Sequence, residues 1–330
     1  MGSDNSKIMK TVRFLIKIIK KFQSDILNFG FKVSLFSCLF DIVLHLNEDN
    51  SIREWVVEKK HKAIKSYLKK KYIQIITPFV SKGWVPDTDN PARNNYVWVC
   101  WWQGETDMDE LTSCCLRSIR QSCPNANVIV ITKNNYSKYI SIPQHIIDKL
   151  NNGTITITHF SDILRMNLLY SYGGLWLDAT MYVSKEIPEE IFRAPLFSQK
   201  GEKFGSFVSN CMWSGFFIAG FQYSLLFDYM KTMFAAYWQN ENKLIDYYLI
   251  DYFISIGYEL IPEIKNHIDN VPYNNPGLYA LEAVLNNEYD ELLWGKMNMD
   301  TSFYKLSRKA DHIKYTASGN ETFYGHILNQ

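Results

Sequence analysis

An acid, an arginine and a second acid lie close together in the stretch HFSDILRMNLLYSYGGLWLDATMYV, residues 159–183. Asp162 and Arg165 are three residues apart in a helical pattern, so their side chains project from one face of the helix. A Gly-Gly turn then leads into a short apolar strand that ends at Asp178. This order brings a guanidinium and two carboxylates together. Such groups bind a diphosphate, with the help of a divalent cation, and accept hydrogen bonds from sugar hydroxyls.

Each of these residues also has a simpler interpretation. Asp162 and Arg165 can form an ordinary surface ion pair, which contributes little to stability. Asp178 can be a turn-forming residue at the end of a strand. The elements that carry the residues therefore decide between the two interpretations.

From residue 96 onward the pattern alternates between strands and helices. Apolar stretches typical of buried strands and segments with helical spacing alternate along the chain at 96–102, 107–123, 127–132, 159–173 and 175–178. This order predicts an α/β fold with a Rossmann-like, mostly parallel sheet flanked by helices. Ligands of such sheets bind beyond the carboxyl ends of the strands, so we expect Trp101–Gly104 and Asp178–Thr180 to share one cleft.

The N-terminal part of the chain is basic and helical. Residues 1–82 hold 16 Lys and Arg against 7 Asp and Glu, whereas residues 83–330 hold 19 against 27. Two amphipathic basic segments within residues 8–75 fit a patch that binds an anionic membrane surface. An ordinary helical subdomain with solvated lysines fits them equally well. The longest apolar stretch, Val33 to Leu46, contains Asp41 and is shorter than a bilayer span.

These patterns divide the chain into three parts: a basic helical accessory region at 1–76, a linker at 77–95 and a catalytic domain at 96–330. The net charge of +1 excludes a dedicated nucleic-acid binder. The six cysteines show no CxxC pair and no disulfide framework, which favours a reducing, cytoplasmic setting.

The stretch 159–183 resembles the core motif of glycosyltransferase family 32, and especially its capsular polysaccharide synthesis branch. That motif reads S-D-x-x-R, an apolar helix, and then Y-G-G-x-x-x-D. Residues 96–132 support it, and the similarity is strongest at 96–185. WSGFFIAG at 213–220 and ETFYGHIL at 321–328 are weaker matches, so the resemblance covers about 96–330. It implies a GT-A fold, a nucleotide-sugar donor and retention of the anomeric configuration.

The resemblance also implies roles for single residues. Asp162 would accept hydrogen bonds from donor-sugar hydroxyls, Arg165 would contact the donor sugar or diphosphate, and Asp178 would be the first acid of the metal motif. Trp101 would stack on the nucleotide base, with Gln103 and Gly104 beside it, and Gly174 would be a further donor-site residue.

The chain departs from the general family pattern Asp-x-Asp, because it reads Asp178-Ala179-Thr180. A threonine hydroxyl is a poorer ligand for Mn²⁺ or Mg²⁺ than a carboxylate. We still expect a divalent cation, held by Asp178 and Thr180 with one further ligand. The candidates for that ligand, each of which can equally be a solvated or capping residue, are His312, Glu321 and His326. Asp246 and Asp251 are candidates for the acceptor side, or simply polar positions of an amphipathic helix.

The expected protein is thus a retaining, hexosyl-type glycosyltransferase of the EC 2.4 class. It would move a sugar from a nucleotide sugar, with a UDP-sugar favoured, to a lipid-linked oligosaccharide in bacterial capsular or surface polysaccharide synthesis. We expect it in the cytoplasm, peripheral on the inner face of the cell membrane. Two alternatives stay open: a non-catalytic, membrane-associated nucleotide-sugar-binding assembly partner, which Thr180 favours, and a nucleotide-sugar hydrolase.

Overall fold

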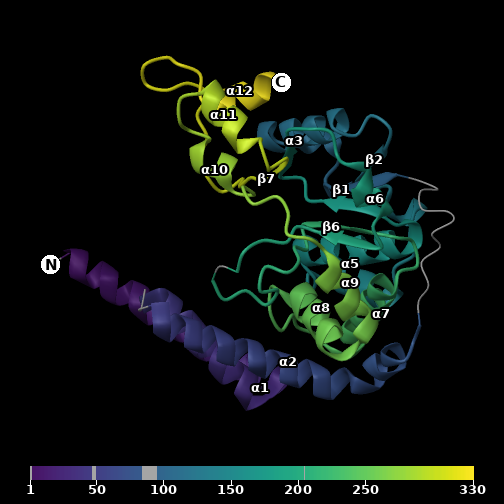
Figure 1. Cartoon of the computed structure of the whole chain (residues 1–330). Helices are drawn as coiled ribbons and strands as arrows, with labels where there is room; N and C mark the ends of the chain where they lie inside the picture. Colours follow the sequence, from purple (N-terminus) through teal and green to yellow (C-terminus); the bar gives the residue numbers. More distant parts are fainter. Residues whose placement is uncertain (1, 47–49, 84–94, 204) are drawn as a thin grey trace.

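The computed structural model describes residues 2–46, 50–83, 95–203 and 205–330. Its centre is a five-stranded sheet with helices on both faces (Figure 1). The strands of this sheet are β1 (Tyr96–Cys100), β2 (Asn127–Ile131), β3 (Gly174–Leu177), β5 (Leu196–Ser198) and β6 (Phe217–Gly220). A separate two-stranded sheet pairs β4 (Met181–Val183) with β7 (Phe303–Lys305).

The strand order of the central sheet is β2-β1-β3-β6-β5. β1 pairs in parallel with both β2 and β3, whereas β6 is antiparallel to both β3 and β5. Within this sheet only β6 therefore runs against the other strands. The predicted α/β fold with a mostly parallel sheet is confirmed.

Alternate side chains of the strands pack on opposite faces of the sheet. One core contains Trp98, Trp176 and Ile218, together with side chains of α5, α7, α8 and α2. The other core contains their neighbours along the strands and side chains of α3 and α6. Because both faces are covered, the strands read as continuous apolar runs in the sequence.

Twelve helices surround the sheet in the described part of the chain. Their bounds are α1 (Gly2–Leu46), α2 (Asn50–Val80), α3 (Glu110–Gln121), α4 (Gln144–Asn151), α5 (Ile157–Tyr172), α6 (Glu189–Arg193), α7 (Leu225–Asn240), α8 (Leu249–Leu260), α9 (Pro262–Asn270), α10 (Ala280–Val284), α11 (Glu291–Met297) and α12 (Phe323–Asn329). Helices α10, α11 and α12 gather with β7 at the end of the molecule opposite α1 and α2 (Figure 1).

Helix α1 is two helical arms joined at Gly30. This glycine has φ 78 and ψ 171, a conformation that side-chain-bearing residues rarely adopt. The arms fold back on each other, because Lys21 pairs with Asp41 and the rings of Phe14 and His45 stack with centroids 3.7 Å apart. The hairpin and α2 together extend past the body of the molecule (Figure 1).

Helix α2 shares a core with the rest of the chain. Ile64, Leu68 and Ile76 are fully buried, in the same cluster as side chains of α7 and α8. The helix continues to Val80, past the predicted boundary at 76, and residues 84–94 of the predicted linker lie outside the described residues. The division of the chain into domains stays a prediction.

One stretch of α1, Val12–Leu46, is long and apolar enough to cross a membrane by length and composition alone. The sequence predicted no such span, because its longest apolar stretch, Val33 to Leu46, is shorter than a bilayer span and contains Asp41. Gly30 breaks the helix inside this stretch, and Lys21 and Asp41 pair across the hairpin. The finding is therefore weak evidence for a membrane span.

Candidate active site

The Gly-Gly turn between α5 and β3 explains how Arg165 and Asp178 meet. Gly173 and Gly174 have φ values of 67 and 93, so both adopt backbone conformations that favour glycine. A Cβ on Gly174 would lie 2.4 Å from the carbonyl oxygen of Tyr96, and one on Gly173 would lie 2.7 Å from the amide nitrogen of Gln222. The turn thus returns the chain directly from α5 into the sheet, with Asp178 at the end of β3.

Arg165 joins the two predicted acids. Its Nη1 lies 3.1 Å from Oδ1 of Asp162, and its Nη2 lies 3.1 Å from Oδ1 of Asp178. The guanidinium carbon lies 4.8 Å from the ring centroid of Trp176, and the side chain is only 5% exposed. A Cβ on Gly215 would lie 2.9 Å from Nη1, so this glycine leaves room for the guanidinium. Arg165 is therefore a fixed bridge between two carboxylates.

Asp178 receives three donors. Oδ1 accepts hydrogen bonds from Arg165 and from Nε1 of Trp176, the latter at 3.0 Å, and Oδ2 lies 3.1 Å from Nζ of Lys305. Burial alone would raise the pKa of Asp178, but the charges of Lys305 and Arg165 outweigh it and hold that pKa below its ordinary value. The carboxylate is thus kept ionised.

Lys305 is the residue of the site that sequence reasoning missed. It lies on β7, which pairs with β4 so that Lys305 is opposite Met181. Its Nζ donates to Oγ1 of Thr180 at 2.7 Å as well as contacting Asp178, so the ammonium occupies the space between the two ends of the Asp-Ala-Thr motif. The segment around it, FYKL, carries no motif, so only the pairing of β4 with β7 reveals its position.

The residues of this site do not fit a divalent cation. Asp178 and Thr180 already bind the ammonium of Lys305. A cation placed beside this ammonium would be repelled, because two unit charges of one sign 4 Å apart repel by about 4 kcal/mol near a protein surface. No three His, Cys, Asp or Glu side chains cluster as metal ligands within residues 2–46, 50–83, 95–203 and 205–330.

The three candidates for a further metal ligand lie elsewhere. Nε2 of His312 lies 2.9 Å from the carbonyl oxygen of Ser307. Glu321 lies 3.5 Å from Nδ1 of His326, whose ring stacks on Tyr289. Each of these three side chains thus contacts neighbours within the C-terminal segment.

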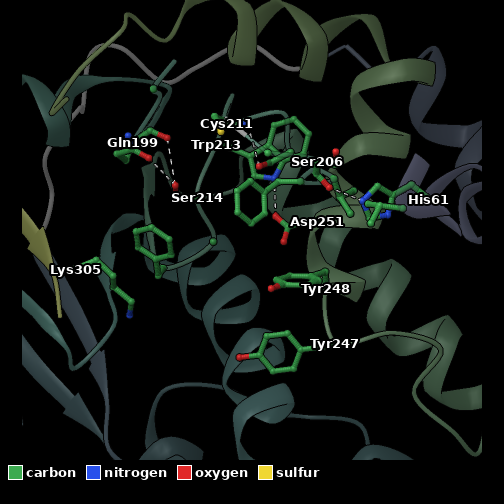
Figure 2. A pocket seen from close by; sticks show the side chains of 18 of the residues that line it. His61, Gln199, Ser206, Cys211, Trp213, Ser214, Tyr247, Tyr248, Asp251 and Lys305 are labelled. Carbon is green, nitrogen blue, oxygen red and sulfur yellow. Dashed lines mark hydrogen bonds between the residues drawn. The ribbon is translucent and has the colours of Figure 1, made fainter. Parts of the chain in front are cut away.

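A cavity of about 670 Å³ opens beside Asp178 and Lys305. Figure 2 shows Lys305 on one side of it and Tyr247, Tyr248 and Asp251 on the other. Its far end is lined by residues of the N-terminal helices, namely Phe40, Arg53, Glu54, Val57, Lys60 and His61. One cavity thus connects the end of β3 with α1 and α2.

The two acceptor-side candidates differ in position. Asp251 lines the cavity, accepts a hydrogen bond of 2.8 Å from Nε1 of Trp213, and burial raises its pKa to about 7. Asp246 instead forms an ion pair of 2.6 Å with Lys60 of α2, in which both side chains are nearly buried. Asp246 therefore holds α2 against the body and does not line the cavity.

Among the predicted donor residues, Asp178 lines this cavity. The others do not, namely Asp162, Arg165, Trp101, Gln103, Gly104 and Gly174. Trp101 follows β1 at the same edge of the sheet as Asp178, and the guanidinium carbon of Arg308 lies 4.7 Å from its ring centroid. Gln103 and Gly104 continue the same loop. The segment that brings Lys305 to Asp178 thus also brings Arg308 to Trp101. Gly174 lies at the start of β3, at the end opposite Asp178.

The comparisons with known proteins identify the family. The family model described as "Capsular polysaccharide synthesis protein" matches residues 46–327. The chain belongs to this family. The match begins before α2, so the second N-terminal helix of this family member is part of the matched region, which is longer than the resemblance seen in the sequence.

Two further comparisons complete this result. No curated protein matches this family member. Among solved structures it is similar to a chain titled "PaToxG Glycosyltransferase", with 12% sequence identity and a TM-score of 0.38, over 63% of this chain and 83% of that chain. The family assignment rests on the family model alone.

Proposed function

We propose that this capsular polysaccharide synthesis family member is a retaining glycosyltransferase of the GT-A type, as its resemblance to glycosyltransferase family 32 implies. The observation that supports this best is the bridge from Asp162 through Arg165 to Asp178 at the carboxyl end of β3. Ligands of open α/β sheets bind at this edge. The adjacent cavity, about 670 Å³, has the size of a small-molecule site and can hold a nucleotide sugar, with a UDP-sugar favoured.

The proposed reaction transfers the sugar without a strong base. The bond between the anomeric carbon and the diphosphate oxygen breaks, and its electron pair stays on that oxygen. The acceptor hydroxyl oxygen bonds to the anomeric carbon from the same face, and its proton passes to the departing diphosphate oxygen. Asp162 would accept hydrogen bonds from the sugar hydroxyls, and Arg165 would keep both carboxylates in place.

The other side of the cavity would hold the acceptor. Tyr247, Tyr248 and Asp251 face the side where Lys305 lies (Figure 2). The tyrosine rings offer flat apolar surfaces and the three polar groups offer hydrogen-bond partners, a combination suited to sugar rings. An oligosaccharide acceptor is therefore the substrate class that this side of the cavity favours.

We further propose that the acceptor is lipid-linked and that the protein lies on the anionic inner surface of the cell membrane. The first arm of α1 exposes Val12, Leu15, Ile16 and Ile19, each about half exposed, beside exposed Arg13, Lys17 and Lys20. Such a combination binds an anionic lipid surface by apolar burial and charge attraction. Because the cavity is also lined by α1 and α2, a lipid-linked acceptor would reach it from these helices.

The test is a screen of nucleotide sugars against the full chain by thermal shift, followed by a transfer assay with the best donor. Donor binding raises the apparent melting temperature by mass action. Asp178→Asn should abolish transfer while the variant stays folded, whereas Asp107→Asn, at an exposed acid, should have no effect. Near-normal turnover by Asp178→Asn would contradict the proposal. Donor binding without turnover would favour an assembly partner, and release of free sugar without acceptor would favour a hydrolase.

A further inference from the structure

We infer that Lys305 takes the place of the divalent cation in the donor site, so that this transferase binds the donor diphosphate without a metal. The inference deepens the proposed function and rests on it. It starts from one contact: Nζ of Lys305 lies 3.1 Å from Oδ2 of Asp178 and 2.7 Å from Oγ1 of Thr180. These are the two side chains of the motif to which the sequence assigned a metal.

The hydrogen-bonding capacity of the ammonium leaves room for a ligand. A lysine ammonium has three N–H donors, and Asp178 and Thr180 accept two of them. The side chain of Lys305 is 21% exposed and lines the cavity, so the third donor has access to it. A phosphate oxygen in the cavity is the acceptor that this donor would suit best, because both groups are charged.

The charges of the site also indicate that Lys305 is the cation that meets the diphosphate. Asp162 and Asp178 carry two negative charges, and Arg165 and Lys305 carry two positive charges. Arg165 directs one Nη at each carboxylate and is almost fully buried, so it is not available to the ligand. Lys305 is therefore the cation of this cluster that can meet the diphosphate. A divalent cation would have to displace it first.

The residue types of the Asp-Ala-Thr motif are consistent with a lysine in place of a metal ion. A second carboxylate at position 180 would favour a metal, whereas a threonine hydroxyl is a weak metal ligand but a good acceptor for an ammonium. Two further contacts fix the position of Lys305. Its Nζ lies 5.1 Å from the ring centroid of Phe216. The backbone N–H of the next residue, Leu306, donates to the carbonyl oxygen of Thr180 at 2.9 Å. Thr180 thus positions the lysine through side chain and backbone.

In the transfer step Lys305 acts as a fixed cation and keeps its proton. When the bond between the anomeric carbon and the diphosphate oxygen breaks, the electron pair adds negative charge to the diphosphate. The ammonium donates a hydrogen bond to a phosphate oxygen and stabilises this charge, which is the task of a metal ion in metal-dependent transferases. The proton that reaches the leaving oxygen still comes from the acceptor hydroxyl.

The experiment measures UDP and UDP-glucose binding to the full chain by calorimetry, in EDTA and in Mn²⁺, together with transfer activity. We expect the wild type to bind and turn over in EDTA. Lys305→Gln should weaken UDP binding roughly tenfold or more, since a charged hydrogen bond is lost. Lys305→Arg keeps the charge and should stay within a few-fold of the wild type. Lys309→Gln, at an exposed lysine of the same segment, is the control.

The outcomes distinguish the role of Lys305 from the transferase proposal itself. Binding that requires Mn²⁺ in the wild type, or unchanged binding by Lys305→Gln, would overturn the role of Lys305 while leaving the transferase proposal intact. A wild type that binds no nucleotide sugar under any condition would overturn both. If Lys305→Gln does not fold, the comparison of EDTA with Mn²⁺ in the wild type still decides the question.

Discussion

Arg165 reaches Asp178 across the Gly-Gly turn, with Nη2 3.1 Å from Oδ1 of the carboxylate. Its other terminal nitrogen holds Asp162 at the same distance. A single planar guanidinium therefore fixes an acid of the helix and an acid of the strand relative to each other. The arrangement depends on the fork geometry of arginine, which a lysine cannot reproduce.

Loss of this bridge should destabilise the protein. Arg165→Ala removes the guanidinium from Asp162 and leaves Asp178 with Lys305 as its cation, and we expect the free energy of unfolding to fall by about 3 kcal/mol. The stability of Arg165→Lys should lie between that of Arg165→Ala and that of the wild type, because a point charge cannot contact both acids equally. Urea unfolding measures both effects.

The matched control is Arg193→Ala. Arg193 also pairs with an acid, Glu189, but both side chains are about 60% exposed, so its loss should cost under about 1 kcal/mol. Equal losses in the two alanine variants would show that the Arg165 bridge is no stronger than a surface ion pair.

Asp251 should make stability depend on pH. Burial raises its pKa to about 7, well above the unfolded value of about 4. Between these values the unfolded chain has released the proton and the folded chain has kept it, so stability falls as pH rises from about 4 to about 7 and levels off above. Asp251→Asn should lack this contribution to the pH dependence of stability.

Urea unfolding of wild type and Asp251→Asn across pH 4.5 to 8 measures the difference. The stability of the wild type relative to the variant should decline toward neutral pH. A difference that stays constant or increases over this range would mean that Asp251 is ionised in the folded protein at low pH.

The exposed apolar face of α1 should control membrane binding. Replacing Leu15, Ile16 and Ile19 with serine removes apolar area and leaves the basic charges, so sedimentation with anionic vesicles should weaken at least tenfold. Deleting residues 1–75 is a poorer test, because Ile64, Leu68 and Tyr72 belong to the core of the body.

The control replaces Leu292, Leu293 and Met299 with serine. These residues are also exposed, on and after α11 at the opposite end of the molecule. Vesicle binding should be unchanged in this variant. Equal vesicle binding by the α1 variant and the wild type would remove the membrane proposal.

Gly174 should not tolerate a side chain. Gly174→Ala places a Cβ 2.4 Å from the carbonyl oxygen of Tyr96 at φ 93, and we expect a loss of about 3 kcal/mol or more. Gly295→Ala lies in α11 with open space around it and should raise stability by up to about 1 kcal/mol. Thermal unfolding of both variants checks the contrast. A mild effect at Gly174 would mean that β1 and β3 can separate locally.

The sequence predicted the parts of the site that are close together along the chain. The helical spacing of Asp162 and Arg165, the Gly-Gly turn and the acid after an apolar strand were sufficient to predict that these side chains meet, because a tight turn returns the helix directly to the sheet. The strands β1, β2 and β3 and the helices α3 and α5 were found in the same way, from local periodicity.

The sequence did not reveal groups that arrive from distant segments. Lys305 joins Asp178 and Thr180 only because β7 pairs with β4, and no pattern in a three-residue strand predicts its partner. The N-terminal helices line the same cavity as Asp178, although their charge pattern suggested a separate accessory region. The proposed metal ligands near the C-terminus were assigned by type alone, and their side chains pack elsewhere.

The amino-acid order by itself determined the α/β fold and the pair of Arg165 with Asp178, since periodicity and a two-glycine turn act over short stretches of chain. The tertiary structure decided which cation accompanies Asp178 and which helices surround the cavity. These contacts join segments more than 100 residues apart, as the Lys305–Asp178 pair with a separation of 127 does, and long-range pairing depends on the packing of the whole chain.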